Sequence, residues 1–438
     1  MKTKILLKSV CVLLITASSF SQNTSFSSLL IPKELKEDAN AVIRLNEKII
    51  KVTSVNELVV KEKKIITVLN KLGNNYVDMY VRYDNDTKVT GLSAVIYDGL
   101  GKKIKKYSKN KFKDVSAVSG GTLYSDDRLK YLEYTPVSYP YTVVFESEYK
   151  TSSTGFIPSW FPIEGYYVSV QKSVYRFINQ TNITYKKKAV NLTNYPINKV
   201  VALNSITYTL NNQKVIDYER YTLPARKFLP KLNISLNEFW LKGVYGTATN
   251  WKDFGKWMYN SLLEGRDILD ESTKTKIKDL VKNTNDPIEK AKIVYQFMQN
   301  KTRYISVQVG IGGWEPIAAN KVDAVGYGDC KGLTNYTKAL LDVVGVKSFY
   351  TVVYADQKRD IDKDFTSMQG NHAILNIPNG NEDIWLECTN QTIPFGFLGD
   401  FTDDRDVLVI TPEGGIIKRT PKYINDYNLI SNSHFSLN

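Results

Sequence analysis

The spacing of hydrophobic residues changes near Trp240, and this change most constrains the fold. From about residue 45 to residue 230, short stretches alternate between apolar and polar residues, as strands of a half-buried sheet do. The clearest are residues 76–83, 92–97, 141–149, 167–177 and 206–210. Residues 33–49 resemble a short helix or an ordered lead-in. The pattern predicts an N-terminal antiparallel β-sandwich-like domain, and the 29 Tyr of the chain agree with β structure.

After Trp240 the pattern becomes helical. Residues 251–264 and 271–283 carry helical periodicity, and Asp286-Pro287 opens a further helix with Pro at its first position. Residues 348–355 then predict a strand, because they are rich in β-branched and aromatic side chains. The chain as a whole is therefore expected to be an α+β protein of two or three domains.

The first 21 residues have the pattern of a secretory signal peptide. Lys2, Lys4 and Lys8 precede an apolar run at residues 10–15, and Ser19 and Ser21 stand before the expected cleavage site. The run is too short to span a bilayer, and we expect no integral membrane span elsewhere in the chain. The sequence thus predicts an exported protein, periplasmic or extracellular.

The formal net charge is +13, and removal of three signal-peptide lysines leaves +13 − 3 = +10. We find no nucleic-acid-binding motif, and an exported protein rarely meets nucleic acid, so none is expected as a partner. The basic balance indicates a solvated surface or attraction to anionic cell-envelope material. The lysine clusters at residues 102–109 and 186–188 are typical of charged strand edges, with a ligand-binding role as the alternative.

Cysteine and histidine are scarce. Besides Cys11 of the signal peptide, the chain has Cys330 and Cys388, and its two histidines are His372 and His434. These counts exclude a disulfide framework and argue against a zinc site. Because the sequence also lacks a phosphate-binding loop and a dinucleotide fingerprint, we expect neither metal nor cofactor.

Cys330 opens a predicted helix. Apolar residues recur at helical spacing from Leu333 to Val344, Gly345 follows as a stop, and Asp329 is the expected N-cap. The partial positive charge at a helix N-terminus favours a thiolate. A structural cysteine would more often lie in the apolar stripe of the helix, so Cys330 is a candidate nucleophile.

A hairpin is predicted to follow, with Asn379-Gly380 as its turn. A turn centred there pairs residues whose numbers sum to 759, which places His372 directly opposite Glu387. The carboxylate could then hold one imidazole nitrogen and leave the other for the thiol. Cys388 would face the other way, as a core residue rather than a resolving thiol. Asn371 and Asn376 are alternative third members, but neither shares the cross-strand position.

These residues resemble the transglutaminase-like superfamily of papain-type cysteine enzymes. The resemblance covers about residues 251–409, and its most specific pieces are GYGDCKGLTNYTKALLDVVGV, NHAILNIP and WLECTN. The preceding region is similar, more diffusely, to a domain of unknown function that often precedes such domains in bacterial envelope proteins, through AVIYDGLGKKIKK and YPYTVVFESEY. The implied organisation is a signal peptide (1–21), a β-rich domain (22–235), a transglutaminase-like domain (236–425) and the start of a further β segment (426–438).

The resemblance implies a catalytic triad of Cys330, His372 and Glu387 that forms a thioester with a peptide or carboxamide carbonyl. The oxyanion would be held by the Cys330 backbone N–H and a second donor, for which Trp314 and Gln308 are candidates; Trp314 as a core residue is the alternative. The chain departs from the family at Glu387, where aspartate is usual, at Cys388, where proline is usual, and at Gly332. A longer acidic side chain can orient the imidazole equally well.

Two functions remain open at this stage. The first is an enzyme that hydrolyses or transfers acyl groups of peptides or proteins, including cell-envelope material. The second is a catalytically silent binding or assembly module with the same fold. The complete set Cys330, His372 and Glu387 favours the first. The oligomeric state cannot be read from the sequence.

Overall fold

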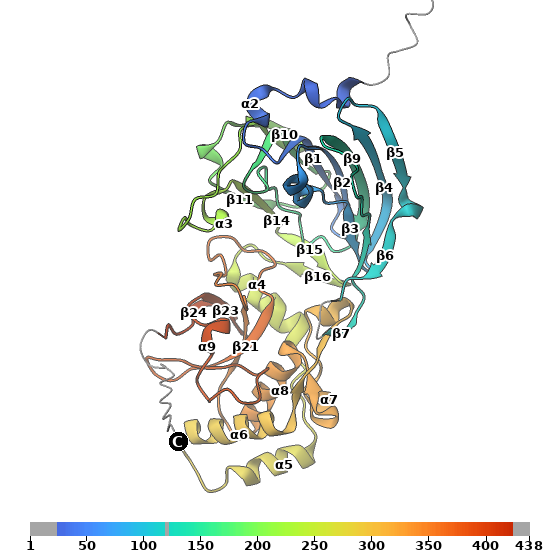
Figure 1. The fold of residues 1–438 in the computed structure, drawn as a ribbon. Coiled ribbons are helices and arrows are strands. Elements are labelled where there is room, and N and C mark those ends of the chain that lie inside the picture. The colour runs from blue at the N-terminus through green and yellow to red at the C-terminus, as the bar shows by residue number, and fades with distance from the viewer. Residues whose placement is uncertain (1–23, 119–121, 424–438) are drawn as a thin grey trace, which may run out of the picture. The chain divides into compact units, whose positions relative to one another are not determined.

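The computed structural model describes residues 24–118 and 122–423, which form two units (Figure 1). The first unit holds residues 24–117, 128–183 and 187–234, and the second begins its main part at residue 235. Residues 118–127 and 184–186 also belong to the second unit, so the expected continuous domain 22–235 is interrupted twice. The predicted signal peptide and the segment 426–438 lie outside the described residues.

The first unit is built on an eight-stranded sheet, of which β1, β2, β9 and β4 are seen side by side in Figure 1. In spatial order its strands are β12 (Ile197–Ala202), β13 (Ser205–Gln213), β10 (Val168–Asn179), β1 (Ala41–Ser54), β2 (Glu57–Val68), β9 (Tyr141–Thr151), β4 (Thr87–Asp98) and β5 (Lys103–Ser108). Neighbouring strands run antiparallel except β1 and β10, which are parallel. Strands are present where residues 92–97, 141–149, 167–177 and 206–210 predict them, whereas residues 76–83 form a strand only from residue 80.

A second, three-stranded sheet packs on this large sheet. It consists of β3 (Tyr80–Tyr83), β8 (Arg128–Tyr131) and β6 (Lys113–Ser116). Val81 and Phe112 share a hydrophobic core with Ile43, Ile66 and Val143 of the large sheet. This arrangement is sandwich-like, as expected from the sequence.

The lead-in to the first sheet differs from the sequence expectation. Helix α2 covers only Lys33–Lys36, and residues 41–49 belong to β1. The segment is rich in Val and Ile, and it pairs with β2 on one side and β10 on the other, so tertiary pairing decides its structure.

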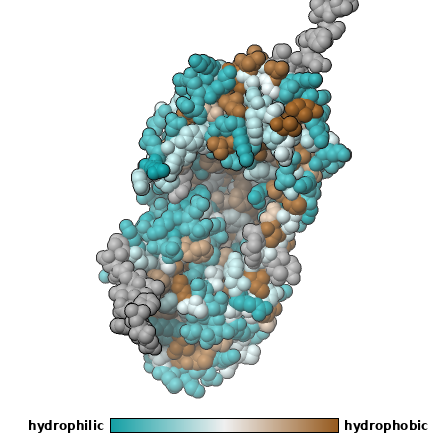
Figure 2. Space-filling model, in the orientation of Figure 1, coloured by the Kyte–Doolittle hydropathy of each residue, from teal (hydrophilic) through white to brown (hydrophobic). Residues whose placement is uncertain are grey.

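The predicted lysine-rich edge is found at β5, the last strand of the sheet, where Lys103, Lys105 and Lys106 are exposed. The face of the molecule seen in Figure 2 is mainly hydrophilic, with hydrophobic residues in separate patches.

The second unit combines helices with a five-stranded sheet. The longer helices are α4 (Trp251–Met258), α5 (Glu271–Leu280), α6 (Pro287–Lys301), α7 (Ala319–Val325) and α8 (Cys330–Val343). The strands, in spatial order, are β22 (Ile384–Leu386), β21 (His372–Ile377), β20 (Phe349–Val353), β23 (Asp406–Thr411) and β24 (Gly414–Arg419). The three helices predicted from residue 251 onward are present, and Asp286 caps α6 by accepting the Ile288 N–H at 2.9 Å.

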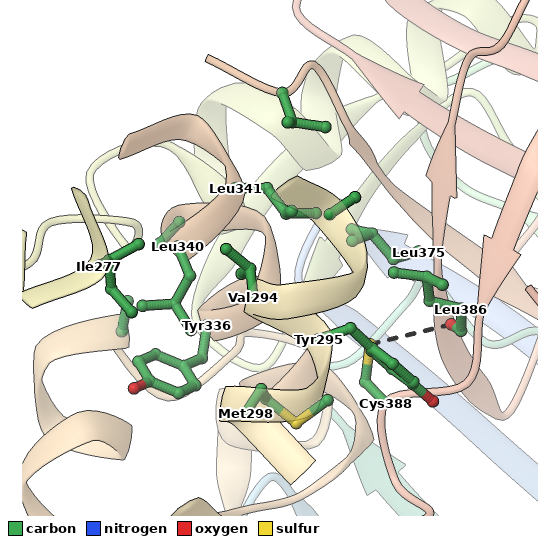
Figure 3. Packing of buried hydrophobic residues seen from close by; sticks show 14 of the residues in the cluster. Ile277, Val294, Tyr295, Met298, Tyr336, Leu340, Leu341, Leu375, Leu386 and Cys388 are labelled. Atoms are coloured by element: carbon green, nitrogen blue, oxygen red, sulfur yellow. Dashed lines mark hydrogen bonds between the residues drawn. The ribbon is translucent and has the colours of Figure 1, made fainter. Parts of the chain in front are cut away.

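The core of this unit fixes α8 between α6 and the sheet (Figure 3). Tyr336, Leu340 and Leu341 of α8 pack in one cluster with α6 and with the strands β21 and β22. The hydroxyl of Thr334 also donates to the Ala373 carbonyl of β21 at 3.2 Å. The start of α8 is therefore held close to the start of β21. Within the described residues, no helix has the length and apolar character needed to cross a membrane.

Candidate active site

Asp329 and Cys330 form the start of helix α8, as the sequence predicts. Asp329 Oδ1 accepts the Gly332 N–H at 2.9 Å, which is the N-cap hydrogen bond. The same carboxylate forms an ion pair with Lys331, and both side chains are almost fully buried. Cys330 is the first residue of the helix and is 6% exposed. Its sulfur thus lies at the positive end of a helix whose cap is rigidly held.

His372 is the first residue of β21, and the pairing of this strand with β20 fixes its position. It lies opposite Val353 of β20, and Asn371 N–H donates to the Val353 carbonyl at 3.0 Å. The side chain of Asn371 accepts the Ala355 N–H at 2.7 Å. Asn371 therefore fastens the strand beside the imidazole, and Glu387 is the hydrogen-bonded neighbour of the ring.

The predicted hairpin register is wrong by two residues. Leu375 pairs with Leu386 and Ile377 with Ile384, so paired residue numbers sum to 761 rather than 759. The connection between β21 and β22 runs from Pro378 to Asp383, which is longer than a two-residue turn. Because side chains alternate along a strand, a shift of two leaves every side chain on its predicted face. Glu387 is therefore still able to reach His372, as a diagonal neighbour.

The imidazole of His372 is hydrogen-bonded to the carboxylate of Glu387. Nε2 lies 2.9 Å from Oε2 and 3.2 Å from Oε1, and both side chains are buried. Thr389 holds the carboxylate in turn, since its backbone N–H and its hydroxyl donate to Oε1 at 3.0 and 2.6 Å. The Tyr295 hydroxyl donates to the Glu387 carbonyl at 2.6 Å. Glu387 is thus fixed at both its backbone and its side chain.

The electrostatics of this pair favour an imidazolium. Burial alone would lower the pKa of His372, but the charge of Glu387 and the adjacent Cys330 raise it well above its ordinary value. Burial alone would raise the pKa of Glu387, whereas His372 and Thr389 bring it below its ordinary value. Cys330 lines the same cavity as the imidazole and is one of the groups that raise the pKa of His372. Since Nε2 is bonded to Glu387, Nδ1 is the ring nitrogen that remains for the sulfur.

Cys330 and His372 line one cavity of roughly 460 Å3 in the second unit. Trp314 and Gln308, the two oxyanion donors suggested by the sequence, line the same cavity. Several further wall residues had no sequence signal, among them Thr122, Tyr304 and Ser306. Their hydroxyls are common in loops and strands, and only the fold brings them to the cysteine.

Cys388 belongs to the core, as the strand alternation predicts. It is fully buried in a cluster with Tyr295, Leu375 and Leu386 (Figure 3). Burial raises the pKa of its thiol to about 12. Both cysteines within the described residues are unbridged. Cys388 therefore fills core volume on the face of the strand opposite to His372.

Comparison with known families matches residues 56–225 to DUF3857, a domain of unknown function with a solved structure. This match covers much of the first unit and the segments 118–127 and 184–186 of the second. Comparison with curated proteins found no match to the chain.

A solved structure similar to this chain is that of a Parabacteroides distasonis protein provisionally named a protease. The two share 15% identity over 87% of this chain and 72% of the other, with a TM-score of 0.63. This likeness shows that the chain has the same fold. A protein of Cytophaga hutchinsonii, provisionally named a cysteine protease, shares 9% identity over 76% of each chain, with a TM-score of 0.22.

Proposed function

We propose that the protein is an exported cysteine enzyme of transglutaminase-like type, acting on peptide or carboxamide bonds through a thioester at Cys330. The observation that carries the proposal is the buried hydrogen bond between His372 and Glu387 beside the thiol. A carboxylate that fixes an imidazole next to a cysteine is the arrangement that nucleophilic cysteine catalysis requires.

The first half-reaction is acylation. The Cys330 sulfur attacks the carbonyl carbon, and the resulting tetrahedral intermediate collapses by breaking the carbon–nitrogen bond. His372 gives its Nδ1 proton to the departing amine. Glu387 keeps the ring oriented through Nε2 during this transfer. The products are a thioester on Cys330 and a free amine or ammonia.

The second half-reaction returns the enzyme to its initial state. Water, or an amine in the case of acyl transfer, attacks the thioester carbonyl and loses a proton to His372. The carbon–sulfur bond then breaks and Cys330 leaves as a thiolate beside the imidazolium. The acyl group is released as a carboxylic acid or a new amide.

The negative oxygen of the tetrahedral intermediate needs hydrogen-bond donors. The Cys330 N–H can supply one donor, because the first N–H groups of a helix have no acceptor within it. Trp314 and Gln308 both line the cavity and carry N–H groups, so either can supply the second donor. The fold shared with the Parabacteroides protein, which is provisionally named a protease, agrees with peptide substrates.

A binding module without catalysis is the alternative. It would keep the fold but would not form an acyl-enzyme. The test is to incubate the full chain and its Cys330→Ala variant with peptides extracted from bacterial envelopes, quench with acid, and measure intact masses. The proposal predicts added mass on Cys330 in the wild type and none in the variant. Identical spectra for the two proteins would contradict it.

A further inference from the structure

A short strand that lies between β6 and β8 in the sequence belongs to the second unit, the unit that holds Cys330 and His372. This strand, β7 (Thr122–Ser125), pairs in parallel with β18 (Ser306–Gln308). Thr122 lies opposite Ser306, and Ser125 lies opposite Gln308. Ser306 and Gln308 line the cavity that contains Cys330 and His372. The strand pairing therefore builds part of the cavity wall from two distant parts of the chain.

Two side-chain contacts reinforce this pairing. The hydroxyls of Thr122 and Ser306 are 3.3 Å apart. Asp126 Oδ1 accepts the Gly310 N–H at 3.2 Å, at the start of the 3-10 turn Gly310–Gly313. Trp314, one of the candidate oxyanion donors, directly follows this turn. The segment thus contacts the wall at its strand and at the turn that leads to Trp314.

The chemistry of this wall suits an amide backbone. Thr122 and Ser306 each carry a hydroxyl, which can both donate and accept a hydrogen bond, and neither carries a charge. Gln308 adds an amide with the same two capacities. A peptide chain presents N–H and C=O groups alternately, so hydroxyl and amide groups can hold it without depending on a charged side chain.

We propose that Thr122 is a substrate-contacting residue of the active site, whose hydroxyl positions the peptide backbone of the acyl donor beside Cys330. Asp126 is the positioning residue that fastens the segment through Gly310. This inference rests on the proposed cysteine chemistry. It also gives the region matched to the domain of unknown function, residues 56–225, a direct part in catalysis.

Two alkylating probes separate substrate positioning from thiol reactivity. Iodoacetamide needs only the sulfur, whereas an N-blocked dialanyl chloromethyl ketone must also lay a peptide along the cavity wall. Second-order rates of Cys330 modification are measured by mass spectrometry on the full chain. Thr122→Val, which keeps shape and β propensity, should slow the peptidyl probe by about tenfold, the effect of one lost hydrogen bond. Its iodoacetamide rate should stay at the wild-type value.

Further variants complete the design. Thr122→Ser keeps the hydroxyl and should restore the peptidyl rate, and Asp126→Ala should lower that rate with the iodoacetamide rate unchanged. Thr87→Val is the matched control, because Thr87 and Thr151 form a similar half-buried hydroxyl pair at 3.1 Å in the first unit. It should leave both rates unchanged.

The possible failures are distinguishable. A wild-type peptidyl rate that depends on His372, together with an equal rate in Thr122→Val, would overturn the positioning role alone. Equal slowing of both probes by Thr122→Val would also overturn it, since the residue would then act on the thiol or the fold. A wild type that reacts with the peptidyl probe no faster than glutathione does would overturn the proposed enzyme itself.

Discussion

The carboxylate of Glu387 holds Nε2 of His372 at 2.9 Å in a buried environment, although the two residues are not directly opposed in their hairpin. The remaining ring nitrogen, Nδ1, is left for Cys330, which lines the same cavity as His372. This relationship gives the cysteine a charged, oriented partner.

Thr389 is expected to support catalysis through Glu387. Thr389→Val removes the hydroxyl that donates to Oε1 at 2.6 Å and leaves the backbone N–H in place. Because the carboxylate is then held less firmly, we expect Cys330 alkylation at pH 6 to slow by about threefold to tenfold. Thr389→Ser should retain the wild-type rate. Thr392→Val, which removes an exposed hydroxyl contact to Asn390, is the control and should have no effect.

Glu387→Gln is expected to make stability depend on pH in a defined way. The pKa of His372 is raised in the folded state, so its charged form adds stability that is complete below its ordinary pKa of 6.5 and declines as pH rises through the folded pKa. The pKa of Glu387 is lowered, so its contribution is complete above its ordinary value of 4.5 and is lost in acid.

The free energy of urea unfolding should therefore differ most between wild type and Glu387→Gln between these two pH values. We expect a loss of about 2 kcal/mol or more there, as for other broken buried pairs. The difference should shrink toward alkaline pH. The control Glu382→Gln, in the exposed hairpin loop, should change stability by less than about 0.5 kcal/mol at any pH. A difference that keeps growing as the pH rises above 6.5 would contradict the assigned ion pair.

Cys388 is expected to be inert in the folded protein. Its thiol is fully buried and burial raises its pKa to about 12, so it stays protonated and shielded at pH 8. Peptide mapping after treatment with iodoacetamide should find the label on Cys330 but not on Cys388. Both cysteines should react after unfolding in urea. Labelling of Cys388 in the native protein would contradict its placement in the buried core.

Arg405 is expected to hold together the loops near His372. It is fully buried and donates to the carbonyls of Asp403 at 2.7 Å, Tyr354 at 2.6 Å and Asp400 at 3.1 Å. Arg405→Met keeps most of the volume but leaves these carbonyls without their donor, and should cost about 3 kcal/mol or more of unfolding free energy.

Arg419 supplies the matched comparison, because its side chain is half exposed and its ion pairs lie at the surface. Arg419→Met should cost no more than about 1 kcal/mol. Equal losses of unfolding free energy for the two variants would mean that burial does not explain the contribution of Arg405 to stability.

Local sequence signals predict much of the fold. The helix start at Asp329-Cys330 is fixed by a capping side chain, and the helix beginning at Pro287 by a proline and its cap, so both are readable over a few residues. Residues 41–49 are different, because they belong to β1, which pairs with the adjacent strand β2 and also with β10, a strand far along the sequence. No local pattern carries the information about β10.

In the candidate site, too, some features can be read from the local sequence and others cannot. The faces of His372, Glu387 and Cys388 follow from strand alternation, which survives a register shift of two, whereas the register itself depends on the length of the Pro378–Asp383 loop. Thr122 could not be found from the sequence. It contacts Ser306 across 184 residues, and a threonine in a strand has no signature of its own.

The pH dependence of Cys330 alkylation tests the central claim most directly. Iodoacetamide modification of the wild type and of His372→Ala is followed by mass spectrometry from about pH 5 to pH 9, with glutathione as the reference thiol. The wild type should react at pH 6 at least about tenfold faster than glutathione, and His372→Ala should follow the glutathione profile. A wild-type profile that coincides with that of glutathione, or that is unchanged in His372→Ala, would contradict activation of Cys330 by His372.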